Sequence, residues 1–191
     1  MNGERVFDST LPACLNDLFL FSMMLVIAAI LTAAMVFQYY GGEMPCPLCL
    51  LQRLAMFGVC FGIIMHFRRG PSARNTGISM LFAMFLLIVS ARQTLLDIYP
   101  RPGHNYIGSA VFGLHMPVWS ILIALAILLA FTFKLAVFGE NNFRNSGPSA
   151  TLSRPAGLLS IYVIALCAVN LLSVIVQCGF GACHTFGYKL L

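Results

Sequence analysis

Residues 18–40 read LFLFSMMLVIAAILTAAMVFQYY, an apolar run without a charged side chain. A helix needs about 20 mostly apolar residues to cross the hydrocarbon core of a bilayer, so this run predicts a transmembrane helix. Similar runs follow at 48–67, 77–98, 116–138 and 156–176. Transmembrane β-strands instead alternate polar and apolar side chains over about 10 residues. The sequence therefore predicts an all-α integral membrane protein, with residues 1–191 forming one transmembrane domain of five spans joined by short loops.

The composition excludes several other classes of protein. Of the 191 residues, 60% are hydrophobic and only 9% are charged, against roughly 25% charged residues in a soluble domain. The mean hydropathy is +0.90. A soluble enzyme, a disordered tail and a secreted disulfide-rich miniprotein all need more polar surface. The net charge is +5, and the basic residues fall near the ends of the apolar runs. That placement is typical of the positive-inside bias of membrane proteins, so we expect no nucleic-acid partner.

The basic residues also predict the orientation of the chain. Arg5, Arg68, Arg69, Arg74, Lys134, Arg144 and Arg154 fall on one side of the predicted membrane, and Arg53, Arg92, Arg101 and Lys189 fall on the other. The richer side is expected to be cytoplasmic, which places the N-terminus inside and the C-terminus outside. Glu4, Asp8 and Asp17 do not suit the basic start of a signal peptide, so the first span is interpreted as a retained helix.

Seven cysteines are distributed unevenly over this topology. We expect Cys14, on the cytoplasmic side, and Cys60 and Cys167, inside spans, to behave as small buried apolar residues. The remaining four form two close pairs, Cys46/Cys49 and Cys178/Cys183, both on the outer side. Thiols oxidise in that compartment, so the two pairs are the predicted catalytic residues.

The first pair belongs to a segment, residues 46–53, that is suited to redox chemistry. A C-x-x-C pair is a recurring dithiol–disulfide switch, although zinc sites use the same spacing. Pro47 favours the first turn of a helix, where amide groups stabilise a thiolate. Arg53 lies four residues after Cys49 and seven after Cys46, so the three side chains share one stripe of a helix. Arg53 either extends to the interface or stabilises an anion near Cys49, which is a thiolate or a reduced lipid-soluble acceptor such as a quinone.

The second pair lies in a glycine-containing tail, residues 177–191. Such a segment is suited to exchanging disulfides between a soluble dithiol and Cys46/Cys49, by thiolate attack through mixed disulfides. His184 follows Cys183 directly and is interpreted first as a solvated histidine, with assistance to the thiol as the alternative.

Several short motifs together resemble a known family. They are CPLCLLQR at 46–53, SARQ at 90–93, GSAVFGLH at 108–115 and QCGFGAC at 177–183. They are similar to segments of the DsbB family, the quinone-linked disulfide-generating oxidases of the bacterial inner membrane. The resemblance covers nearly the whole chain after about residue 14.

The resemblance implies a four-helix core with an extra C-terminal helix, and it implies roles for the site residues. Cys46 and Cys49 match the pair that passes electrons to ubiquinone or menaquinone, and Arg53 matches the arginine beside the quinone. Cys178 and Cys183 match a pair that accepts electrons from a periplasmic DsbA-like thioredoxin-fold protein.

The chain departs from the best-known members of the family in two places. Their second pair lies between spans three and four, whereas the corresponding loop here, residues 97–115, holds no cysteine. His184 stands where the similar branch has proline. Both departures concern the electron donor and leave the quinone end untouched.

The sequence also offers two candidate pocket residues and two alternative functions. Arg92 and His115 are candidates for shaping a quinone pocket, with extension to the interface and helix-end packing as the alternatives. No metal is predicted at the site, but the two cysteine pairs could instead make a four-thiolate zinc site or a copper relay. The third possibility is a structural membrane subunit whose disulfides are inert.

Overall fold

The computed structural model describes residues 3–42, 45–98, 113–138 and 150–179, and all five elements in this part of the chain are helices. They are α1 (Gly3–Tyr40), α2 (Pro47–Arg69), α3 (Ala73–Ile98), α4 (Met116–Phe138) and α5 (Ala150–Cys178). Each is long and apolar enough to cross a membrane. The prediction of an all-α membrane bundle is confirmed.

The five predicted spans fall on these helices, but α1 and α5 begin earlier than the apolar runs do. Helix α1 begins at Gly3, whereas the apolar run that predicts the first span begins at residue 18. Helix α5 begins at Ala150 and contains Pro155. A proline near the start of a helix removes few hydrogen bonds, because the first amide groups have no partner within the helix.

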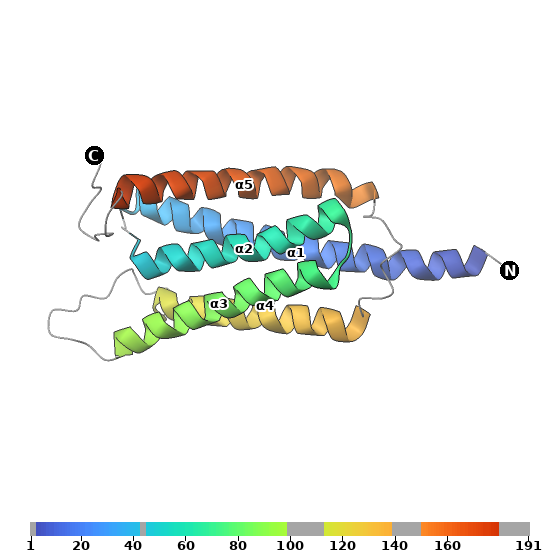
Figure 1. Cartoon of the computed structure of the whole chain (residues 1–191), viewed down its shortest axis with the longest axis horizontal. Coiled ribbons are helices and arrows are strands. Elements are labelled where there is room, and N and C mark those ends of the chain that lie inside the picture. The colour runs from blue at the N-terminus through green and yellow to red at the C-terminus, as the bar shows by residue number, and fades with distance from the viewer. Residues whose placement is uncertain (1–2, 43–44, 99–112, 139–149, 180–191) are drawn as a thin grey trace.

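The helices form an elongated bundle with α2 at its centre (Figure 1). Helix α2 packs chiefly against α3, α3 packs against α4, and α5 packs against α1 and α2. The turn between α2 and α3 is tight, with Gly70 at a φ of 87° and its amide donating to the carbonyl of His66. The start of α2 and the end of α5 lie at the same end of the bundle (Figure 1).

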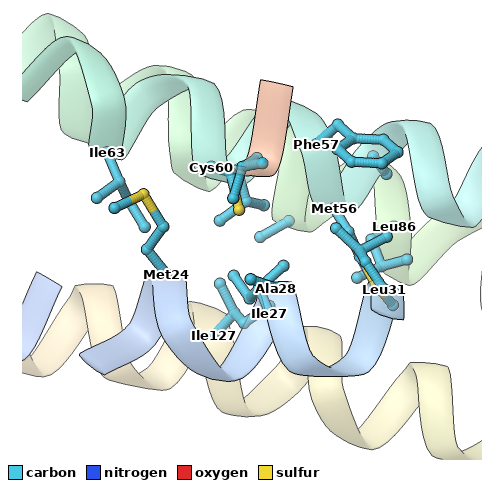
Figure 2. Packing of buried hydrophobic residues seen from close by; sticks show 14 of the residues in the cluster. Met24, Ile27, Ala28, Leu31, Met56, Phe57, Cys60, Ile63, Leu86 and Ile127 are labelled. Atoms are coloured by element: carbon cyan, nitrogen blue, oxygen red, sulfur yellow. The ribbon is translucent and has the colours of Figure 1, made fainter. Parts of the chain in front are cut away.

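The core lies where α1 and α2 face each other, with contributions from α3 and α4. Figure 2 shows Met24, Ile27, Ala28 and Leu31 of α1 beside Met56, Phe57, Cys60 and Ile63 of α2, with Leu86 and Ile127 nearby. Cys60 is fully buried in this core and Cys167 packs against it, as predicted. The prediction for Cys14 is wrong, because its side chain is exposed.

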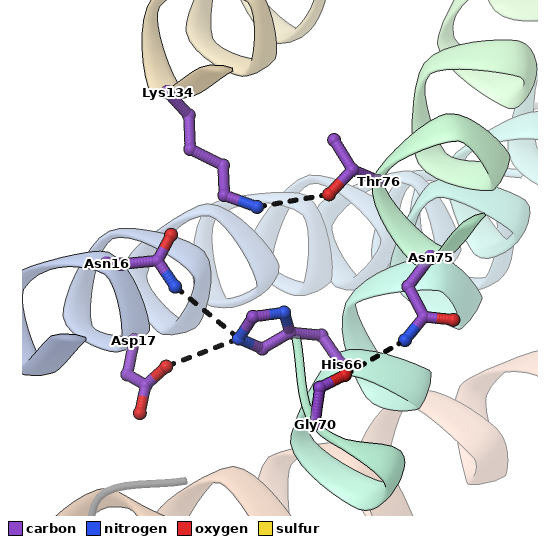
Figure 3. A network of polar contacts seen from close by, with 7 residues as sticks. All are labelled: Asn16, Asp17, His66, Gly70, Asn75, Thr76 and Lys134. Atoms are coloured by element: carbon purple, nitrogen blue, oxygen red, sulfur yellow. Dashed lines mark hydrogen bonds and ion pairs between the residues drawn. The ribbon is translucent and has the colours of Figure 1, made fainter. Parts of the chain in front are cut away.

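A polar network lies at the opposite end of α2 from Cys46 (Figure 3). His66 Nε2 lies 3.3 Å from Asp17 Oδ1 and 3.5 Å from Asn16 Nδ2. Lys134, which the sequence places on the predicted cytoplasmic side, is buried and donates to Thr76 Oγ1 at 3.1 Å. These contacts join α1 to α2 and α3 to α4 at the end where the basic loops predict the cytoplasm.

Candidate redox site at the start of α2

Cys46 and Cys49 are joined by a disulfide at the first turn of α2. Cys46 is the N-cap residue, Pro47 occupies the first turn, and Cys46 Sγ accepts the amide of Cys49 at 3.1 Å. The helix therefore begins at the cysteine pair, as the sequence predicts. Free amide groups at a helix N-terminus favour negative charge, so this position suits a pair that becomes a thiolate on reduction.

Gln93 of α3 is the side chain that faces both sulfurs. Its Nε2 donates to Cys46 Sγ at 3.4 Å and to Cys49 Sγ at 3.6 Å. The carboxamide is buried, and its Oε1 accepts Gln52 Nε2 at 2.9 Å. This second bond holds the amide with its hydrogens toward the sulfurs. An N–H donor so placed stabilises a thiolate more than a disulfide, because bonds to charged groups are stronger.

The polar chain continues from Gln52 into α4. Ser120 Oγ donates to Gln52 Oε1 at 3.2 Å, and all three side chains of the chain Ser120–Gln52–Gln93 are buried. Buried polar groups are costly when left without partners and rigid when satisfied. The chain therefore fixes α2, α3 and α4 around the disulfide.

Arg53 lies two turns into α2 and points to the other side of the helix. Its Nη1 donates to Gln38 Oε1 at 2.5 Å, to Asn170 Oδ1 at 3.4 Å and to Met35 Sδ at 3.4 Å. Its Nη2 donates to the carbonyl of Ala34 at 3.0 Å. The half-buried guanidinium is thus held within the bundle by α1 and α5. These acceptors carry no net charge.

The three side chains predicted to share one stripe of the helix, Cys46, Cys49 and Arg53, therefore contact different neighbouring helices. The sulfurs contact Gln93 of α3, whereas Arg53 contacts α1 and α5. Spacing along one helix sets the direction of a side chain at Cβ, but the long arginine side chain follows its acceptors.

Gln38 leaves a buried donor beside Arg53. Its Oε1 accepts from Arg53, while its Nε2 is buried and has no hydrogen-bond partner within the part of the chain that the structure describes. A buried polar atom without a partner indicates a missing acceptor. A carbonyl oxygen is an acceptor that Gln38 and Arg53 would suit together.

Cys178 ends α5 at the same end of the bundle as Cys46 (Figure 1). It is buried and disulfide-bonded, and Cys183 lies outside the described residues. The preceding residue, Gln177, donates from Nε2 to the carbonyl of Pro45 at 2.9 Å. The structure thus brings the first cysteine of the tail to the segment that carries the first pair.

The positions of Arg92 and His115 neither support nor contradict the predicted role of these residues in shaping a pocket. Arg92 is exposed on α3, beside the buried Gln93. His115 precedes α4, and its carbonyl accepts the amides of Val118 and Trp119 in the first turn. Their participation in a quinone pocket stays a prediction. His184 lies outside the described residues.

The sequence interpretation missed the carboxamides that build this site, which are Gln38, Gln52, Gln93, Asn170 and Gln177. Polar side chains within membrane spans are costly and indicate function. That signal was present in the sequence for Gln38, Gln52, Gln93 and Asn170, whereas Gln177 falls just beyond the fifth predicted span.

Within the described ranges, no group of three or more histidine, cysteine or acidic residues is arranged to hold a metal. Cys46 and Cys49 are bonded to each other, so neither is a thiolate ligand in this state. A four-thiolate site would require both pairs to be reduced.

A family-level comparison agrees with the cysteine site. The family model of DsbB, disulfide bond formation protein DsbB, matches residues 16–134. The match runs from within α1 to within α4 and includes Cys46, Cys49 and Arg53, and α5 lies beyond it.

Individual relatives carry the same name. Disulfide bond formation protein B of Azoarcus sp. strain BH72 is 36% identical over 94 residues, which are 47% of this chain and 56% of the relative. The protein of that name from Cupriavidus metallidurans is 25% identical over 149 residues, which are 63% of this chain and 92% of the relative. The chain thus spans little more than half of the first relative and nearly all of the second. No solved structure matches the chain.

Proposed function

Because the chain belongs to the DsbB family, we propose that it is a protein-dithiol:quinone oxidoreductase of the bacterial inner membrane. It takes electrons from a periplasmic DsbA-like thioredoxin-fold protein and passes them through Cys178/Cys183 and Cys46/Cys49 to ubiquinone or menaquinone. Its N-terminus is cytoplasmic and its C-terminus periplasmic, in accordance with the basic residues of the loops.

The observation that carries this proposal is the Cys46–Cys49 disulfide at a helix N-terminus, with Gln93 donating to both sulfurs. The tail pair is first reduced by the partner's dithiol. A thiolate of Cys178 then attacks Cys46 Sγ, and Cys49 leaves as a thiolate. Attack of Cys183 on Cys178 closes the tail disulfide and releases Cys46. The net result is an oxidised tail and a reduced Cys46/Cys49 pair.

The acceptor end is proposed to lie at Arg53 and Gln38. Bound there, a quinone would supply a two-electron, two-proton acceptor for the reduced pair. Arg53 and the unpartnered Nε2 of Gln38 offer two kinds of donor to an oxygen atom. Arg92 and His115 are proposed to shape the pocket at the same end of the bundle.

The test follows quinone absorbance after a reduced thioredoxin-fold dithiol protein is added to the purified protein in detergent. We expect steady loss of oxidised quinone, abolished by Cys49→Ser. Arg53→Ala should lower quinone turnover by a factor of about 10–100, since a hydrogen bond to a charged group contributes about 1.5–3 kcal/mol. Exchange between the two cysteine pairs should continue in that variant.

Two results would contradict the proposal. Unchanged turnover of Arg53→Ala at every quinone concentration would remove the role of Arg53. Absence of turnover with several donors and quinones would reject the activity, and stoichiometric bound zinc or copper would then support the metal site.

A further inference from the structure

The last turn of α5 meets the segment before α2 through one buried hydrogen bond. Gln177 Nε2 donates to the carbonyl of Pro45 at 2.9 Å, and Gln177 is 1% exposed. Gln177 immediately precedes Cys178, and Pro45 immediately precedes Cys46. We propose that Gln177 is a positioning residue that holds Cys178 against Cys46 for disulfide exchange. The inference rests on the proposed relay between the two pairs.

The burial of Gln177 argues against a role in packing alone. Its Oε1 is buried without a hydrogen-bond partner in the part of the chain that the structure describes. An unsatisfied buried oxygen destabilises the fold, whereas an apolar side chain of the same shape would avoid that loss. The presence of a carboxamide at this buried position is therefore best explained by the hydrogen bond that its Nε2 donates to the backbone beside Cys46.

Other contacts set the position of α5 before this last turn. Tyr39 of α1 is hydrogen-bonded to Ser173, and Asn170 accepts from Arg53. Gln177 lies one turn beyond Ser173 on the same side of α5. The earlier contacts align the helix, and Gln177 fixes its end, where Cys178 and Cys46 are both buried.

The step that Gln177 would promote needs no external oxidant. The Cys178 thiolate attacks Cys46 Sγ, so that a Cys46–Cys178 bond forms and the Cys46–Cys49 bond breaks. The electron pair leaves on Cys49 as a thiolate. Holding the attacking and attacked sulfurs together raises the effective molarity of Cys178, and misplacement by about 1 Å can lower a rate by about 10²-fold.

The experiment uses the full chain carrying Cys183→Ser, in which Cys178 has lost its tail partner. A jump from acidic to mildly alkaline pH starts the exchange, acid and alkylation stop it, and peptide mass spectrometry measures the Cys46–Cys178 product. The rate is divided by the rate at which a small free thiol opens the same Cys46–Cys49 bond, which gives the effective molarity. Gln177→Met, which keeps the length but removes the donor, should lower this ratio at least about tenfold.

Ser173→Ala is the matched control, because it removes a contact between α5 and α1 one turn away while the contact of Asn170 with Arg53 still holds α5 in place. It should leave the ratio within about twofold of the parent. An unchanged ratio in Gln177→Met, or an equal loss in Ser173→Ala, would overturn the proposal. If Gln177→Met fails to fold, Gln177→Leu is judged by the same two criteria. The assay contains no quinone, so a failure of quinone reduction would not affect its outcome.

Discussion

Several hydrogen bonds around α2 are made by side-chain amides, which can donate and accept without carrying a net charge. Gln93 offers its hydrogens to both sulfurs, while its oxygen is occupied by Gln52. A charged donor at that place would be more costly inside the bundle. The amide of Gln93 can therefore stabilise a thiolate when the pair is reduced, and as a neutral group it is less costly to bury than a charged donor while the disulfide is closed.

Replacing Gln93 with leucine tests this role. In a background carrying Cys178→Ser and Cys183→Ser, Gln93→Leu should slow the opening of Cys46–Cys49 by a small dithiol about tenfold. A hydrogen bond to the leaving thiolate contributes about 1.5–3 kcal/mol, and 1.4 kcal/mol corresponds to a factor of ten. The measurement is stopped alkylation followed by mass spectrometry.

Thr94→Val is the control, because Thr94 Oγ1 donates only to the carbonyl of Ser90 among the contacts described. An equal slowing in both variants would indicate a disturbed α3 rather than a lost donor.

The position of the cysteine pair could be predicted from the sequence, whereas the side chains that contact it could not. Pro47 and the C-x-x-C spacing place the pair at a helix start by local rules, and the structure agrees. The contacts of Gln93 depend on how α3 packs against α2, which no local rule gives. For the same reason the acceptors of Arg53 on α1 and α5 were not foreseen.

Helices α2 and α3 pack against each other through a side of α2 that carries two glycines. A Cβ at Gly58 would lie 2.2 Å from the Phe82 ring, and one at Gly62 would lie 2.2 Å from Ser79 Oγ and 2.7 Å from the carbonyl of Asn75. Ser79 Oγ in turn donates to the carbonyl of Val59 at 3.0 Å. Small residues at such contacts allow helix backbones to approach within membranes. The hairpin could be predicted from the short loop, but this contact could not.

A methyl group added at Gly62 should therefore separate the two helices. Gly62→Ala is expected to lower the free energy of unfolding by about 1–3 kcal/mol, because backbone and Ser79 must both move. Thermal unfolding in detergent measures the change. Gly77→Ala is the control: its Cβ meets no atom within 4 Å, and alanine is favoured over glycine in a helix by about 0.5–1 kcal/mol. Equal stability of the two variants would contradict the close-approach argument.

Across the whole molecule, the two ends of the bundle differ in chemistry. One end carries the disulfide and Cys178, and the other carries the buried network of His66, Asp17 and Lys134 (Figures 1 and 3). Helix α1 has 38 residues and so is about 57 Å long, nearly twice the hydrocarbon thickness of about 30 Å. Counting about 20 residues back from Tyr40 leaves Cys14 beyond the hydrocarbon core, at the end away from the disulfide.

Cys14 therefore reports which end of the molecule faces the cytoplasm. Its exposed thiol should react with a membrane-impermeant maleimide in inside-out vesicles at least about tenfold faster than in right-side-out vesicles, because the reagent reaches only the outer face. Buried Cys60 should stay unlabelled in both until the protein is denatured. Faster labelling in right-side-out vesicles would place the Cys46–Cys49 pair in the compartment that keeps thiols reduced. A periplasmic dithiol protein could then not be its electron donor, and the proposed relay would fail together with the orientation.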